Sequence, residues 1–193
     1  MPAPMKVYLA GPEVFLPNGR EVIEAKQALT RRYGFEPNVW LGEGEPPPAE
    51  PFAFGLYISA ANEAVMRDSD LIIANLTPFR GISADIGTAY ELGFMCAMGK
   101  PAFGYTNDPR GYVERLTGDF YAGKVEADAE GVLRGTDGLM VEDHGMVDNL
   151  MVDGGIDRNG GVIVRRRVEP ARILDDLGAL EECLGIARDR LPG

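Results

Sequence analysis

Cysteine and histidine are scarce in this sequence, and their scarcity argues against several kinds of site. The 193 residues include two cysteines, Cys96 and Cys183, which are too few for a disulfide framework and lack metal-ligand spacing. His144 is the one histidine, so a Cys/His zinc site or a Ser-His-Asp triad has little material. Zinc chemistry and histidine-based catalysis are therefore poor explanations of this chain.

Positive charge and long apolar runs are also lacking. There are 19 Lys and Arg residues against 30 Asp and Glu, which gives a net charge of −11. Nucleic acid or an anionic membrane would be repelled, whereas uncharged nucleosides would not. No apolar run reaches the ~18 residues that a membrane span needs, and no basic segment precedes an apolar one at the N-terminus. We expect a cytoplasmic enzyme or binding protein without nucleic-acid or membrane partners.

Strand-like and helix-like patterns alternate along the chain. Continuous aliphatic runs predict buried strands at 5–11, 70–76 and 101–106. Apolar residues at helical spacing predict helices at 19–34, 53–70, 86–99 and 170–191. This alternation indicates an α/β fold with a mainly parallel sheet of about five strands, in which 5–10, 70–75 and 101–105 are neighbours. We expect a single domain over residues 1–193.

Two stretches carry weaker signals. Residues 42–52 are acidic and rich in proline, which predicts an exposed loop. Residues 117–168 are rich in Gly and Asp, and they are compatible with an irregular excursion or with a hairpin around 160–168. Within this stretch, residues 142–155 gather acidic side chains but lack the spacing of an EF-hand calcium loop.

Ligands of open parallel sheets bind outside the carboxyl ends of the strands, at a topological switch point. The residues that follow the first two strands, 11–13 and 75–83, are therefore the first candidates for a site. No G-x-G-x-x-G follows the first strand, and no G-x-x-x-x-G-K-[ST] occurs anywhere in the chain. A dinucleotide or a nucleoside triphosphate is not the expected ligand.

Glu91 is the only charged residue among the fourteen from Ile86 to Gly99. Asp85 lies six residues earlier, about 9 Å away along a helix axis. Two carboxyls at this spacing can serve one ligand, one attacking a carbon and the other handling a proton on the leaving group. The alternative is an N-cap at Asp85 and a surface ion pair at Glu91. The apolar surroundings favour chemistry, because a carboxylate is rarely buried without a reason.

Two further residues have open interpretations. Tyr8 stands in an otherwise aliphatic strand, so its hydroxyl needs a partner if it is buried, which a water molecule in the core could also supply. Asp70 lies where a helix gives way to a strand, and with Asp68 it could simply form a turn.

Three blocks together resemble the nucleoside 2-deoxyribosyltransferase family. They are KVYLAGPEVFLP at 6–17, SDLIIANLTPFRGISADIGTAYELGFMCAMGKP at 69–101 and VDNLMVDG at 147–154. The resemblance implies a flavodoxin-like (Rossmann-like) sandwich and exchange of the base on a 2′-deoxynucleoside. It further implies free nucleobases and 2′-deoxynucleosides as partners, no metal or organic cofactor, and a homo-oligomer with shared active sites.

The resemblance also implies catalytic roles for three residues. Glu91 would attack C1′ and form a covalent deoxyribosyl intermediate. Asp85 would contact the base and transfer a proton to it. Tyr8 would hold the Glu91 carboxylate in line by a hydrogen bond.

Four residues would bind substrate by the same resemblance. Asp70 would lie on the base side, and Gly11 would line the site after the first strand. Asn149, next to Asp148 in the D-N motif, would reach from a neighbouring subunit toward the 5′-hydroxyl.

Two other functions compete with base exchange. A 2′-deoxynucleoside 5′-monophosphate N-glycosidase would deliver the same intermediate to water, but Asp148 is expected to repel its 5′-phosphate. A non-catalytic nucleotide-sensing Rossmann-like module would not need the Asp85–Glu91 pair. We therefore expect the transferase.

Overall fold

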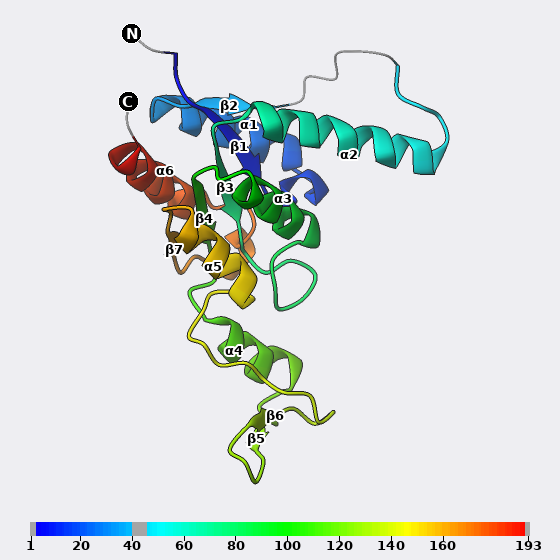
Figure 1. The fold of residues 1–193 in the computed structure, drawn as a ribbon, viewed down its shortest axis with the longest axis vertical. Coiled ribbons are helices and arrows are strands. Elements are labelled where there is room, and N and C mark those ends of the chain that lie inside the picture. Colours follow the sequence, from blue (N-terminus) through cyan, green and yellow to red (C-terminus); the bar gives the residue numbers. More distant parts are fainter. Residues whose placement is uncertain (1–2, 40–45, 192–193) are drawn as a thin grey trace.

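The computed structural model describes residues 3–39 and 46–191 (Figure 1). Residues 42–45 of the predicted loop 42–52 lie outside the described residues. The end of that prediction is wrong, because a helix already begins at Pro51.

A five-stranded, all-parallel sheet forms the centre of the fold, in the order β2-β1-β3-β4-β7. The strands are β1 (Lys6–Ala10), β2 (Glu36–Asn38), β3 (Leu71–Asn75), β4 (Ala102–Thr106) and β7 (Ile163–Arg165). This order is the flavodoxin-like one, so the predicted fold class and the three predicted neighbours are confirmed. The sequence did not predict β2, whose three residues are too few and too polar for a strand pattern.

Two layers of helices cover the sheet (Figure 1). These layers are formed by α1 (Gly19–Arg32), α2 (Pro51–Asp68), α3 (Ile86–Ala97), α5 (Leu150–Arg158) and α6 (Gly178–Arg190), whereas α4 (Tyr112–Arg115) lies outside them. One core cluster joins α1 and α6 to the side chains on one face of the sheet. A second cluster joins α2, α3 and α5 to the other face, which includes Tyr8. Alternation along β1 therefore directs Tyr8 toward α3.

Two predicted helices differ in their starting points. The predicted helix 53–70 starts at Pro51, because the Glu50 carboxylate accepts hydrogen bonds from the backbone N–H groups of Phe52 and Ala53 at 3.2 and 2.8 Å. The predicted helix 170–191 starts only at Gly178, after a single 3-10 turn at Pro170–Arg172.

An arm of residues 111–146 extends away from the sandwich (Figure 1). It contains α4, a π-helical turn at Leu116–Phe120, and the antiparallel pair β5 (Glu126–Ala127) and β6 (Leu133–Arg134). The expected irregular excursion is therefore present in the first half of 117–168. A hairpin around 160–168 is wrong, because β7 joins the main sheet parallel to β4. Within the described ranges, no helix is long and apolar enough to cross a membrane.

Candidate active site

The strand order has a switch point between β1 and β3. From β1 the chain moves outward to β2 and then returns to place β3 on the other side of β1. The segments that leave these two strands, a 3-10 turn at Pro12–Phe15 and the loop 76–85, both start at the carboxyl edge, which is where open parallel sheets bind their ligands.

Tyr8 and Glu91 meet close to this switch point. The Tyr8 hydroxyl donates a hydrogen bond to Glu91 Oε1 at 2.6 Å, across 83 residues of sequence. Tyr8 is 9% exposed, so the partner that its hydroxyl needs is a carboxylate. The expected contact between these residues is present, and no arginine within residues 3–39 and 46–191 forms an ion pair with Glu91.

The carboxyl of Glu91 is poised between its two charge states. Burial raises its pKa from the ordinary 4.5 to about 7, against the lowering effect of the Tyr8 hydrogen bond. The negative charge of Asp85 raises the pKa as well, while Lys26 lowers it. The pKa of Tyr8 is also raised by burial and by Glu91, so the tyrosine stays protonated and donates.

Glu91→Gln should stabilise the fold at alkaline pH. The folded state holds a proton on Glu91 up to pH about 7, whereas the unfolded state releases it near 4.5, so Glu91 favours folding least above pH 7. Glutamine removes this penalty and still accepts from Tyr8. Denaturant unfolding should therefore give a gain of up to ~3 kcal/mol at pH 8 that vanishes at pH 4. A gain independent of pH would contradict this account.

Asp85 is placed by the start of α3. Its Oδ2 accepts a hydrogen bond from the backbone N–H of Thr88 at 3.0 Å, which caps the helix as expected. Its charge also acts on the pKa of Glu91. Asp85 is thus both the N-cap and a second carboxylate close to the first.

Gly11 makes room for a buried carboxylate. A Cβ atom at this position would lie 2.2 Å from Glu13 Oε2, so any other residue would displace the Glu13 side chain. Glu13 Oε1 in turn accepts hydrogen bonds from Lys26 Nζ at 2.6 Å and from Asn75 Nδ2 at 2.9 Å. Gly11 was expected to line the substrate site, and this stays a prediction. Lys26 was not predicted as part of a site, although a lysine on the apolar face of helix 19–34 is an unusual signal.

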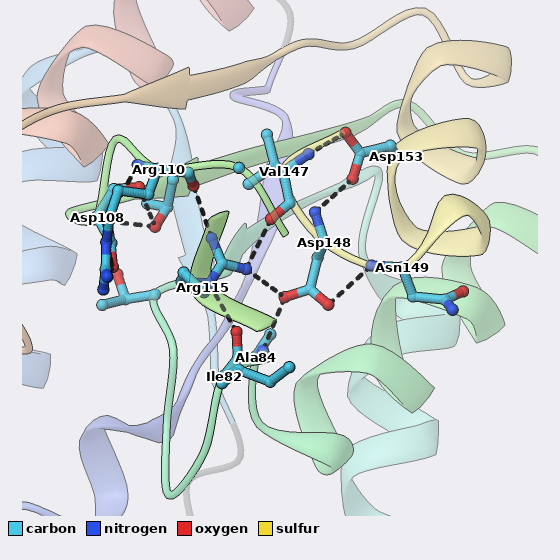
Figure 2. Close-up of polar contacts among 12 residues, drawn as sticks. Ile82, Ala84, Asp108, Arg110, Arg115, Val147, Asp148, Asn149 and Asp153 are labelled. Atoms are coloured by element: carbon cyan, nitrogen blue, oxygen red, sulfur yellow. Dashed lines mark hydrogen bonds and ion pairs between the residues drawn. The ribbon is translucent and has the colours of Figure 1, made fainter. Parts of the chain in front are cut away.

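Asp148 is a structural residue rather than an exposed substrate contact. It is 3% exposed, and its Oδ2 accepts from Ala84 N at 2.9 Å and pairs with the buried Arg115 at 3.5 Å (Figure 2). Arg115 also donates to the carbonyls of Ile82 and Val147 at 2.7 Å. The positive charge of Arg115 offsets that of Asp148, so the ion pair weakens the expected repulsion of a 5′-phosphate.

Asn149 caps the next helix and is exposed. Its Oδ1 accepts from Met151 N at 3.0 Å at the start of α5. Figure 2 shows its side chain directed away from Arg115. Because Asp148 bonds to Ala84, the D-N segment lies against the loop that leads into Asp85.

Asp70 is not brought to this site. It precedes β3, and its Oδ2 accepts from Lys6 N at 2.7 Å, at the start of β1. These are the amino ends of parallel strands, so Asp70 lies at the opposite edge of the sheet from Gly11. In the sequence, Asp70 directly precedes β3, whereas the loop 76–85 that leads to Asp85 directly follows it.

An arginine and two aromatic rings form a rim where the turn Pro12–Phe15 meets the loop 76–85. The rings of Phe15 and Phe79 stack with centroids 5.4 Å apart, and the Arg80 guanidinium lies 4.9 and 4.8 Å from their centroids. Phe15 is 53% exposed, so the rim offers a flat apolar surface. Among residues 3–39 and 46–191, no cluster of three or more His, Cys, Asp or Glu side chains could hold a metal ion.

Comparison with known proteins assigns the chain to a family. Residues 7–151 match the family described as nucleoside 2-deoxyribosyltransferase. The chain belongs to this family. The family match and the solved relative described next indicate a nucleoside deoxyribosyltransferase-type enzyme.

Two relatives of this nucleoside 2-deoxyribosyltransferase family member cover most of its length. A 2-desoxiribosyltransferase from Leishmania mexicana is 31% identical, with a TM-score of 0.57 over 77% of this chain and 85% of that one. An uncharacterized protein of Schizosaccharomyces pombe is 33% identical over 81% of this chain and 79% of its own.

Proposed function

We propose that this protein transfers the 2-deoxyribosyl group between the nucleobases of 2′-deoxynucleosides through a covalent intermediate on Glu91. The observation that carries the proposal is the partly buried Glu91 carboxylate, held by Tyr8 at 2.6 Å beside the β1/β3 switch point. A carboxylate fixed in this way at the ligand edge of the sheet is suited to attack a carbon.

The proposed reaction has two displacements. A Glu91 oxygen attacks C1′, the bond from C1′ to the base nitrogen breaks, and Asp85 gives the departing base a proton. The acceptor base then returns a proton to Asp85 and attacks C1′, which releases Glu91. Each displacement inverts C1′, so the product retains the configuration of the substrate. The flat rim around Phe15 gives a planar base an apolar contact.

Base transfer requires that water does not reach the intermediate first. Glu91 lies in a helix whose other residues from Ile86 to Gly99 are uncharged, and its neighbours on the same helix face, Thr88 and Met95, are 1% and 0% exposed. A dry wall of this kind restricts the competing nucleophile while the bases exchange. Asp148 gives no strong argument against the rival 5′-monophosphate N-glycosidase, because its negative charge is paired with Arg115.

A base-exchange assay tests the proposed function. The protein is incubated with deoxyinosine and free adenine, and in parallel with deoxyinosine 5′-monophosphate and adenine. We expect deoxyadenosine and hypoxanthine in the first mixture. Hypoxanthine and free sugar without deoxyadenosine would identify a hydrolase, and cleavage of the monophosphate alone would identify the rival glycosidase. No reaction in either mixture would favour a module that only binds.

We further propose that the active site is composite, with Asn149 supplied by a neighbouring subunit. Asn149 is exposed at the start of α5, where Met151 is 66% exposed as well. An amide offers both a donor and an acceptor to a sugar 5′-hydroxyl. Mixing Glu91→Ala protein with Asn149→Ala protein should restore part of the activity after subunit exchange, because some interfaces then pair an intact Glu91 with an intact Asn149.

The mixing experiment has two internal controls. Each variant must be well below wild type by itself, and subunit exchange must be confirmed by mass spectrometry of isotope-labelled protein. Glu91→Ala mixed with a second Glu91 variant should stay inactive. If exchange is complete and the Glu91–Asn149 mixture recovers nothing, each subunit builds its own site.

A further inference from the structure

Helices α2 and α3 run side by side in the same direction. Glu63 on α2 accepts a hydrogen bond from the Tyr90 hydroxyl on α3 at 2.8 Å, across 27 positions of sequence. One turn further along both helices, Arg67 lies 4.9 Å from the centroid of the Phe94 ring, which is the same offset in sequence. Because the offset stays constant, the two helices are parallel and in a fixed register.

This register leaves the first two turns of α2 beyond the end of α3. Ile86, the first residue of α3, comes opposite Ser59, so residues 51–58 extend past it. They form an overhang about 12 Å long, at a rise of ~1.5 Å per residue. Figure 1 shows this end of α2 extending away from the sandwich. Residues 51–58 are named the α2 overhang.

The α2 overhang is apolar and open to solvent. Residues 51–62 carry no charged side chain. Phe52 and Leu56, one turn apart on the stripe that leads to Glu63, are 73% and 56% exposed. Met66 is the one buried residue of α2, every residue of which the structure describes. A helix in a protein owes most of its stability to packing, and a single copy gives the overhang little of it.

Two residues of α3 extend this apolar surface. Ile86 and Tyr90 lie one turn apart on the same side of α3, and they are 86% and 57% exposed. With Phe52 and Leu56 they form the overhang patch, in which Leu56 lies between Phe52 and Ile86. Four large side chains with these exposed fractions offer on the order of 500 Å² of apolar surface. An apolar patch of this size on a monomer is often an interaction site.

Charge indicates what covers the overhang patch. The chain has a net charge of −11, so two copies repel each other over most of their surfaces, and an anionic membrane is repelled as well. The patch itself carries no charge, and the nearest charged residues, Glu63 and Arg67, pair with each other at 3.4 Å. Two copies can therefore meet at this patch without opposing carboxylates.

The size of the patch agrees with a contact between two copies. A standard interface takes ~800 Å² from each partner, of which an apolar centre is only a part. In a two-fold contact the same patch is used twice, so a single association covers the exposed apolar side chains of both chains.

We propose that a second copy of this chain docks on the overhang patch through its own overhang patch, around a two-fold axis close to Leu56. This dimer does not depend on base exchange. One consequence of it does rest on the proposed function. The overhang passes the start of α3, where Asp85 is the N-cap, so the docked copy lies beside the proposed active site.

Leu56→Glu tests the patch by charge. The two-fold axis brings each new carboxylate close to its counterpart, so the dissociation constant should rise ~100-fold or more. Sedimentation velocity over a dilution series measures the change. Wild type should sediment as a dimer or as a multiple of a dimer. Leu139→Glu is the matched control, because Leu139 is 64% exposed on the arm, away from the patch, and it should assemble as wild type does.

Leu56→Cys gives a second readout that does not weaken the contact by charge. Close to the axis, the two introduced thiols face each other, so a mild oxidant such as copper phenanthroline should link two chains through a disulfide. Wild type should link little, because Cys183 is buried and Cys96 is partly buried. Leu139→Cys, with its thiol on the arm, should link no more than wild type.

Four results would overturn the proposal. They are a wild type that is monomeric throughout the dilution series, an assembly that Leu56→Glu leaves intact, equal dissociation by Leu139→Glu, and a wild-type assembly with an odd number of chains. If Leu56→Glu does not fold, Leu56→Cys decides by itself, since the absence of a linked dimer refutes the two-fold contact. The expected assembly and link in a protein that exchanges no bases would refute the proposed function and leave this inference standing.

Discussion

Glu91→Gln and Glu91→Ala should each abolish base exchange, with a loss of about 10⁴-fold or more. The amide of glutamine fits the same space and can accept from Tyr8, whose hydroxyl donates to Glu91 Oε1 at 2.6 Å. It cannot form a stable ester with C1′, so the first displacement fails while the fold remains. Initial rates of deoxyadenosine formation from deoxyinosine and adenine measure the effect.

Glu63→Gln is the matched control for this experiment. Glu63 also accepts a hydrogen bond from a tyrosine, Tyr90 at 2.8 Å, but on the exposed surface of α2. Its loss should leave exchange within about twofold of wild type, because surface substitutions rarely change more. Near-normal exchange by folded Glu91→Ala would remove Glu91 from the mechanism. So would a trapped sugar adduct that peptide mapping assigns to another side chain.

Asp85→Asn should slow substrates whose base leaves poorly by about 10²–10⁴-fold, the usual contribution of a general acid. Asparagine caps helices as well as aspartate does, so the hydrogen bond to Thr88 N and the start of α3 should survive. Substrates whose base is already a stable anion need little protonation, and they should lose far less. The comparison is between deoxyinosine and a deoxynucleoside with an activated leaving group.

The unfolding free energy of Asp85→Asn serves as the control for the cap and should match that of wild type. An equal loss of rate for both substrates would mean that Asp85 only positions the base. Asp85→Asn should also lower the pKa of Glu91, because it removes the negative charge of Asp85. This effect on Glu91 can be separated from the loss of proton transfer. Rates compared at pH 8.5, where Glu91 is ionised in both proteins, isolate the proton transfer.

Part of the fold can be predicted from the sequence, because some elements are marked by residue patterns within their own segment. The aliphatic run of β3 and the single charge of α3 each identify an element without reference to anything distant, and Glu91 stood out on that basis. The hydrogen bond from Tyr8 to Glu91 was expected only from the family resemblance. The short strand β2 could not be predicted in this way. Its three residues carry no strand pattern, and they form a strand because they pair with β1.

Residues whose meaning depends on a distant partner were misjudged. Asp148 looked like a free carboxylate because its partner, Arg115, stands 33 residues away. Asp70 was assigned to the wrong edge, since a sequence shows that a residue borders a strand without showing what else gathers at that end. Lys26 had its signal within one helix, but the carboxylate that explains it comes from another segment.

The contacts of Arg115 bear on how this protein can diverge. Its guanidinium donates to the Arg110 carbonyl at one end of the arm and to the Val147 carbonyl at the other, both at 2.7 Å. The arm is thereby closed at its base, and the chain beyond it is a nearly independent insertion. Doubling the length of such a loop costs only about 0.6 kcal/mol in closure entropy. Gains and losses of sequence can therefore accumulate between residues 116 and 145 while the segments that flank Asp85 and Asn149 keep their places.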